Sequence, residues 1–391
     1  MAISPFENAV RPEAREAPDS GIMDVFNYGR GKPGLIPLWA GEGDLPTPAF
    51  IAEAAAAAMR AGETFYTWQR GIPELRQALA EWHSEAIGRA FDPERFFVTA
   101  SGMQAIQFAA RLVAGPGDEV IVPTPAWPNI SAALGIAGAR AVPLPMQFGN
   151  AGWSLDLDRL ADAIGSRTTA IFINSPSNPT GWTASLSEIE AILALARARG
   201  LWLIVDEVYQ RFFYRGGPRA PSFYDVAEDD DRILYVNTFS KNWAMTGWRI
   251  GWLAAPIGLG RVIENLVQYA TSGVAAFMQR AAITALREGE WFIREQVARA
   301  VEGRAIACSA LQSTGRARFV PPDGAFYLFF TVDGEPDTRR LAFRLIDEAN
   351  IGLAPGTAFG AAGGGFLRLC FLRSAADLTL AMTRLTGALA R

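Results

Sequence analysis

Residues 187–209 read SEIEAILALARARGLWLIVDEVY, and this stretch decides the fold class. Its first part, 187–200, is helix-like, begins after a serine and ends on a glycine. Its second part, LWLIVDEVY at 201–209, is a nearly continuous apolar run that leads into a carboxylate. Strands of this kind are typical of parallel sheets whose two faces are both covered by helices.

The same alternation extends along the middle of the chain. Helix-like segments separate several further strand-like runs, which are RFFVTAS (95–101), DEVIVPTP (118–125), TAIFINSP (169–176), RILYVNTFS (232–240) and IGWLAAP (250–256). The pattern predicts an α/β fold with three layers, in which a mostly parallel central sheet lies between two layers of helices.

The length of the chain predicts two domains. A single hydrophobic core rarely grows past about 250–300 residues, and this chain has 391. We expect a large ligand-binding domain at 46–290, followed at 291–391 by a linker helix and a smaller α+β domain. The spacing at 290–313 predicts that helix. Residues 1–45 are rich in proline and glycine, precede the first clear helix and are expected to form an arm that contributes to the small domain.

Composition argues against several classes of function. The chain has 36 basic and 40 acidic residues, a net charge of −4 and no basic run, which disfavours binding to a nucleic-acid backbone. Two cysteines, Cys308 and Cys370, cannot form a disulfide framework, and no Cys/His spacing suggests a metal site. The only histidine, His83, lies in a helix-like segment and is expected at the surface, so catalysis by a histidine triad is nearly excluded.

The chain shows no targeting or membrane segment. Its start lacks the apolar core of a signal peptide, and no run of about 18 apolar residues occurs later. We therefore expect a soluble, cytoplasmic protein that does not bind membranes.

Polar and aromatic residues follow five of the predicted strands. They are Ser101, Gly102 and Met103 at a helix start, then Trp127, then Asn178 in a proline-rich turn, then Asp206 with Tyr209, and finally Lys241. Each has an ordinary structural explanation, such as a helix cap, aromatic packing, a common Asn-Pro turn or a salt bridge to a structural arginine. However, ligands of open α/β sheets bind beyond the carboxyl ends of the strands, so these side chains are expected to share one site.

The whole set fits one ligand, pyridoxal phosphate (PLP). Its aldehyde needs a lysine for a Schiff base, which Lys241 supplies. Its pyridine nitrogen needs an anion such as Asp206, and its ring needs an aromatic stacking partner. Its phosphate suits the free N–H groups at a helix start.

With these residues in place, the chain resembles the class I/II aminotransferases, which are fold-type-I PLP-dependent enzymes of the aspartate aminotransferase-like superfamily. The resemblance runs from Leu38 to Arg373, and its motifs occur in the family order. They are LWAGEGDLPTP, YTWQRGIPELR, SGMQAI, SPSNPTG, VDEVY, SKNWAMTGWRIGW, PPDGAFY, APGTAFG and FLRLCF.

The resemblance implies roles for individual residues. Lys241 matches the Schiff-base lysine, Asp206 the partner of the pyridine nitrogen, and Tyr209 the phenol that donates to the 3-oxygen of the ring. Asn178 matches an amide that contacts the same oxygen, and Trp127 the aromatic side chain that stacks on the ring. The phosphate site corresponds to Ser101, Gly102, Met103 and Arg249, with Thr238 where many members have a serine.

The substrate and the neighbouring subunit are also implicated by the resemblance. Arg368 matches the arginine that clamps the substrate carboxylate, with Gly41, Asn178 and Trp127 beside the substrate. Tyr66 matches a tyrosine that reaches the phosphate of the neighbouring subunit, which implies a homodimer with shared active sites. The cofactor implied is pyridoxal 5'-phosphate, and no metal is implied.

The reaction implied is transamination by a ping-pong mechanism that moves the amino group of an L-amino acid to a 2-oxo acid. Lys241 would remove the α-proton of the amino acid and deliver it to the aldehyde carbon of the cofactor, and a second 2-oxo acid would reverse the sequence. Met103 stands where aspartate-specific members often have a lysine, so we expect neutral or aromatic donors to be favoured over dicarboxylic ones.

Another PLP reaction remains open: a C–S β-lyase, a decarboxylase or a cyclopropane-forming synthase. A transcription regulator would need a DNA-binding module that 1–45 cannot supply. A nicotinamide-dependent dehydrogenase would need a glycine motif between a strand and a helix, whereas the glycines at 360–365 lie in a late loop.

Overall fold

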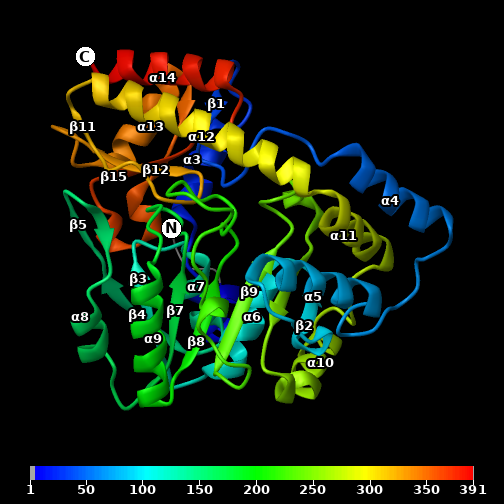
Figure 1. Cartoon of the computed structure of the whole chain (residues 1–391). Coiled ribbons are helices and arrows are strands. Elements are labelled where there is room, and N and C mark those ends of the chain that lie inside the picture. Colours follow the sequence, from blue (N-terminus) through cyan, green and yellow to red (C-terminus); the bar gives the residue numbers. More distant parts are fainter. Residues whose placement is uncertain (1–4, 391) are drawn as a thin grey trace.

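The computed structural model describes residues 5–390 and contains a central sheet between two layers of helices (Figure 1). The sheet of the described chain has seven strands in the order β2-β10-β9-β8-β7-β3-β4. Neighbouring strands run parallel from β9 to β4, whereas β10 is antiparallel to both β2 and β9. The strand bounds are β2 Phe96–Thr99, β3 Glu119–Thr124, β4 Arg140–Pro145, β7 Thr168–Asn174, β8 Trp202–Asp206, β9 Ile233–Thr238 and β10 Gly251–Ala254. The predicted α/β fold with a mostly parallel sheet is confirmed.

Alternate residues of each strand face opposite helical layers, as in β8, where Leu203 and Val205 join one core and Ile204 joins the other. One layer consists of α6 (Gly102–Val113), α7 (Asn129–Ile136) and α10 (Gly260–Gln268). The opposite layer contains α5 (Pro73–Ile87), α8 (Leu157–Asp162), α9 (Leu186–Arg199) and α11 (Ala276–Glu288), and α4 (Ala49–Arg60) packs against α11. The continuous apolar strands arise because both faces of the sheet are covered.

A second sheet has its own core near the C-terminus (Figure 1). Its four strands in the described chain follow the order β11-β12-β15-β14, and every pair is antiparallel. The predicted helix at 290–313 is α12, Glu290–Ser313. The remaining bounds are β5 Gln147–Gly149, β6 Gly152–Ser154, β11 Ala317–Arg318, β12 Tyr327–Val332, α13 Thr338–Ala349, β13 Ile351–Gly352, β14 Ala354–Pro355, β15 Phe366–Cys370 and α14 Ala375–Leu389.

The N-terminal segment contains helices where none was clear from the sequence. They are α1 (Pro5–Ala9), α2 (Pro12–Arg15) and α3 (Gly21–Gly29). Packing stabilises α3, since Val25 is fully buried and the helix contacts α13 and β14. A short strand, β1 (Ile36–Pro37), then pairs with β13. Short helices of this kind depend on tertiary contacts more than on propensity, so their pattern is weak in the sequence.

The expected surface position of His83 is wrong. His83 lies on the inner side of α5 and is 3% exposed, and the indole Nε1 of Trp252 donates a hydrogen bond to its Nε2 at 3.2 Å. Burial lowers the pKa of the imidazole to about 3. Within residues 5–390, no helix is both long and apolar enough to cross a membrane.

Candidate active site

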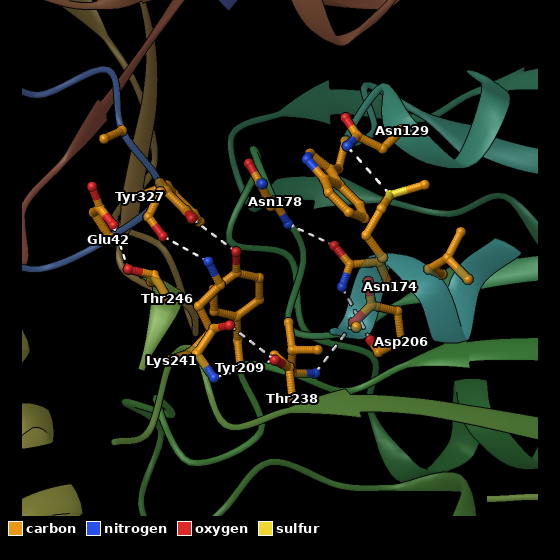
Figure 2. Close-up of a pocket in the computed structure, with 18 of the residues that line it drawn as sticks. Glu42, Asn129, Asn174, Asn178, Asp206, Tyr209, Thr238, Lys241, Thr246 and Tyr327 are labelled. Carbon is orange, nitrogen blue, oxygen red and sulfur yellow. Dashed lines mark hydrogen bonds between the residues drawn. The ribbon is translucent and has the colours of Figure 1, made fainter. Parts of the chain in front are cut away.

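A cavity of about 430 Å³ lies at the carboxyl edge of the central sheet, between that sheet and residues of β12 and β15 (Figure 2). Eleven of the thirteen residues predicted for the site line it. These are Gly41, Gly102, Met103, Trp127, Asn178, Asp206, Tyr209, Thr238, Lys241, Arg249 and Arg368. Ser101 and Tyr66 do not line it.

Asp206 ends β8 and is 4% exposed. Among the described residues its carboxylate accepts one hydrogen bond, from the backbone N–H of Val208 at 3.3 Å. Burial raises the pKa of this carboxyl to about 7, against the opposing effects of that hydrogen bond and of the Lys241 charge. A buried carboxyl with so little support is stabilised as an anion when a cationic group lies beside it.

Lys241 follows β9 and comes from the short segment between β9 and β10. Its Nζ donates to the backbone carbonyl of Gly41 at 2.7 Å, across 200 positions of the chain. Desolvation lowers the pKa of the ammonium to about 8, although the charge of Glu42 acts in the opposite direction. At neutral pH a larger fraction of this lysine is therefore in the neutral amine form than of an exposed lysine.

Arg368 lies in the middle of β15 and is 2% exposed. Its Nη1 donates to the side-chain oxygen of Asn178 at 2.9 Å, and its Nη2 donates to the backbone carbonyl of Trp39. The guanidinium lies 4.5 Å from the ring centroid of Tyr327 and 4.8 Å from that of Phe359. The Nε of Arg368 has no hydrogen-bond partner among the described residues, so the buried cation can still take an anion such as a carboxylate.

Another end of the cavity has the features of an anion site. The N-terminus of α6 begins at Gly102, where free backbone N–H groups favour an anion. Thr238 and Arg249 line the cavity with it, and Arg249 Nη1 donates to the carbonyl of Thr246 at 2.6 Å. Ser101 is the helix cap, and its hydroxyl accepts from the N–H of Gln104 at 3.2 Å. This contact is the ordinary explanation that the sequence left open for Ser101.

Tyr66 lies away from the cavity and is 92% exposed. It belongs to a loop between α4 and α5 in which Phe65 and Trp68 are also exposed. A single chain therefore does not bring Tyr66 to the other predicted residues.

Several lining residues were missed by the sequence reasoning. They are Ile22, Trp39, Ala40, Glu42, Ile106, Asn129, Asn174, Val208, Val236, Ser240, Thr246 and Tyr327. Asn174 could have been predicted, because it ends a strand of the same parallel sheet as Asp206. In the structure it pairs with Asp206 of β8, and its side-chain amide donates to the Asp206 carbonyl at 3.0 Å. Tyr327 and Trp39 come from distant segments and carry no local signal.

The residues of the cavity fit PLP on observations of this structure. A buried carboxyl that needs a cationic partner, a lysine with a lowered pKa and the start of α6 all border the same space. Trp127 adds an aromatic ring to the lining. Together they can face a ring nitrogen, an aldehyde carbon, a phosphate and a flat heterocycle.

Comparison with known proteins gives a consistent result. The family model described as aminotransferase class I and II matches residues 33–385. An aspartate aminotransferase of Thermotoga maritima is 35% identical over 351 residues, which cover 90% of each chain. An aromatic-amino-acid aminotransferase of Thermococcus litoralis is 34% identical over 373 residues, 94% of each chain. A crystal structure of aspartate aminotransferase from Thermotoga maritima superposes with a TM-score of 0.90 at 34% identity, covering 98% of this chain and 100% of that one.

Proposed function

This chain belongs to the class I and II aminotransferase family and is a PLP-dependent transaminase; we propose that it moves the amino group of a neutral or aromatic L-amino acid to a 2-oxo acid. One of these relatives is named for aspartate and another for aromatic amino acids. Because the names differ, we infer the preferred donor from the residues that line the cavity.

We assign the chemistry to the residues around the cavity. Bound PLP supplies an electrophilic carbon for the amino group and a ring that accepts electrons as the α-proton leaves. As a neutral amine, Lys241 would take that proton on Nζ and deliver it to the former aldehyde carbon of PLP, and its lowered pKa favours the neutral form. Asp206 keeps the ring nitrogen protonated, since a cation beside this buried carboxyl stabilises its anion.

The remaining groups hold the substrate and the phosphate. Arg368 binds the α-carboxylate through a buried guanidinium, with Asn178 already hydrogen-bonded to it. The N-terminus of α6, Thr238 and Arg249 hold the phosphate. These roles account for each basic side chain among the described residues that line the cavity.

The preference for a neutral donor is supported by the small number of basic side chains that line the cavity. Among the described residues that line it, the basic side chains are Lys241, Arg249 and Arg368. Each of them is assigned to the cofactor or to the α-carboxylate. A second carboxylate would be desolvated beside Met103 without a positive partner, and Glu42 adds a negative charge. A neutral side chain avoids both costs.

A panel of single half-reactions tests this proposal. Each amino acid is mixed with the PLP form, and conversion of the bound cofactor to its amine form is followed by absorbance. We expect leucine, methionine or phenylalanine to react with a kcat/KM roughly tenfold or more above that of aspartate. A tenfold difference corresponds to about 1.4 kcal/mol, which is the cost we expect when one carboxylate is bound without a positive partner. Equal or faster reaction of aspartate would contradict the donor preference. Release of pyruvate and ammonia from an S-substituted cysteine added to the panel would indicate a C–S β-lyase.

Replacing Met103 supplies the matched test. Met103→Lys should raise the kcat/KM for aspartate about tenfold or more relative to phenylalanine, because a charge-assisted hydrogen bond becomes available. Met103→Leu keeps the site apolar and should leave the ratio nearly unchanged. If both variants change the ratio alike, the charge at this position does not set the preference.

A further inference from the structure

Two buried phenols meet at the wall of the cavity (Figure 2). Tyr327 is the first residue of β12 and is fully buried, and Tyr209 follows β8 and is 4% exposed. Their hydroxyl oxygens are 2.8 Å apart. Within residues 5–390 neither hydroxyl has another hydrogen-bond partner, so the contact between them is the one that orients both.

The direction of this hydrogen bond decides which phenol can donate to a ligand. Burial raises the pKa of both phenols, so each keeps its proton at neutral pH. A single contact between two oxygens uses only one of the two protons. The hydroxyl that accepts therefore keeps its own proton free for another group that lines the cavity.

The surroundings favour Tyr327 as the donor. The Arg368 guanidinium lies 4.5 Å from the Tyr327 ring, and a cation there stabilises the negative character of a donating phenol. Asp206 carries the nearby negative charge that acts on Tyr209 and favours its role as acceptor. Two other titratable groups of the described chain face the phenols. Cys370 pairs with Tyr327 across the sheet, and the Nζ of Lys241 lies 5.9 Å from the ring centroid of Tyr209. The Arg368 charge also acts on Tyr209, in the opposite sense to Asp206.

Within residues 5–390, the Tyr327 hydroxyl makes no hydrogen bond to the neighbouring Gly41 backbone. A Cβ atom on Gly41 would lie 2.6 Å from the Tyr327 hydroxyl, so the Gly41 backbone closes that side. The Gly41 carbonyl already accepts from Lys241 at 2.7 Å. Among the described residues, the Tyr209 oxygen is the acceptor that lies within hydrogen-bond distance of the Tyr327 hydroxyl in the structure.

We propose that Tyr327 is a positioning residue that donates to the Tyr209 hydroxyl, turns the proton of Tyr209 toward the ligand and ties it to the Arg368 side chain. The inference rests on the proposed function and on the role that the resemblance implies for Tyr209, which is to donate to the 3-oxygen of PLP. A phenol that accepts a hydrogen bond is a stronger donor, so Tyr327 strengthens the contact that Tyr209 makes. Tyr327 thereby connects the carboxylate-binding arginine with the cofactor side of the cavity.

The variant Tyr327→Phe tests this proposal, because it keeps the ring against Arg368 and removes only the hydroxyl. The readout is the pH midpoint of the change in visible absorbance of bound PLP. We expect this midpoint to rise by about half a pH unit or more, since weaker donation from Tyr209 stabilises negative charge on the 3-oxygen less. The affinity for a 2-oxo acid should change by less than about twofold, since the ring contact to Arg368 remains.

Two comparisons separate this role from a structural one. Tyr224→Phe removes another buried hydroxyl that does not line the cavity, and it should leave the midpoint unchanged. Tyr209→Phe should raise the midpoint further than Tyr327→Phe does. Adding Tyr327→Phe to Tyr209→Phe should then shift it no more, because the effect passes through the missing hydroxyl.

An unshifted midpoint in Tyr327→Phe would overturn the inference and leave the proposed function intact. A full shift that persists in the Tyr209→Phe background would also overturn it, because Tyr327 would then act without Tyr209. A parent protein that stays colourless after incubation with PLP would overturn both the inference and the proposed function.

Discussion

Lys241 and Asp206 border one cavity, and burial acts on them in opposite directions. It lowers the pKa of the lysine to about 8 and raises that of the carboxyl to about 7, so the charged form of each is disfavoured. A ligand that joins covalently to Lys241 and places a protonated nitrogen beside Asp206 would remove both costs. The two residues are therefore better suited to the loaded protein than to the empty one.

The chain offers a direct test of the lysine assignment, because its only two lysines are Lys32 and Lys241. Borohydride reduction of the PLP-loaded protein should fix the cofactor to the peptide that contains Lys241, as read by peptide mass. Lys241→Ala should lose this label and lower transamination by at least about 10³-fold, as expected when a catalytic base and covalent anchor is removed.

Lys32→Ala is the matched control, since Lys32 pairs with Asp347 outside the cavity. We expect it to keep both the label and the activity. A label on Lys32, or undiminished turnover by Lys241→Ala, would refute the assignment.

Helix α5 shows how an element can be predicted while its buried face is not. Its sequence pattern predicts a helix, but the same pattern places the polar side chain of His83 at the surface. In the fold α5 packs against the sheet and against α11, and the rings of Phe96, Tyr224 and Trp252 lie next to the imidazole. A helix covered on two sides buries a wider stripe than one surface helix would.

Burial of His83 predicts a pH dependence of stability. Its pKa is lowered from 6.5 to about 3, so between these pH values the histidine is protonated in the unfolded chain and neutral in the folded chain. This contribution is complete above pH 6.5 and is lost as the pH falls toward 3, with a slope of about 1.4 kcal/mol per pH unit. In His83→Gln the free energy of unfolding, measured with urea between pH 6.5 and 4, should depend less steeply on pH than in the parent.

The comparison of slopes isolates this residue. His83→Gln lowers stability at every pH if the buried amide is poorly satisfied, so the slope is the readout and the absolute value is not. Contributions of Asp206 and Glu207, whose pKa values burial raises to about 7, are common to both proteins. Equal slopes would show that His83 is protonated at its ordinary pKa.

At the scale of the whole molecule, one loop remains unexplained by a single chain. Phe65, Tyr66 and Trp68 are 84%, 92% and 60% exposed. Large aromatic side chains gathered on a surface are typical of an interface. The resemblance assigns Tyr66 to the phosphate of a neighbouring subunit, so we expect two chains to assemble with this loop at their contact.

Sedimentation of the purified protein should therefore give a dimer. The double variant Phe65→Asp with Trp68→Asp should shift it to the monomer and raise the Kd for PLP by roughly tenfold or more, because the contribution of Tyr66 is lost with the partner. Leu186 is an exposed apolar residue at the start of α9, and Leu186→Asp should leave both the dimer and the Kd for PLP unchanged. A parent that sediments as a monomer yet binds PLP tightly would contradict the shared site.

The sequence by itself determined the alternation of helices and strands in the middle of the chain, except for the edge strand β4, and most of one edge of the site. Helix α9 runs from Leu186 to Arg199 between a serine cap and a left-handed glycine, and β8 follows it, as the opening stretch indicated. Asn178, Asp206 and Lys241 could be grouped because the carboxyl ends of parallel strands meet at one edge. These conclusions need only local patterns and a rule of topology.

Only the tertiary structure decided the opposite wall of the cavity and the environment of each group. Arg368 meets Asn178 across 190 positions and Lys241 meets Gly41 across 200, and no local pattern records such contacts. The contact of Tyr327 with Tyr209 and the burial of His83 are of the same kind. Burial, hydrogen-bond direction and pKa depend on every element packed around a side chain, so they are fixed only when the whole chain has folded.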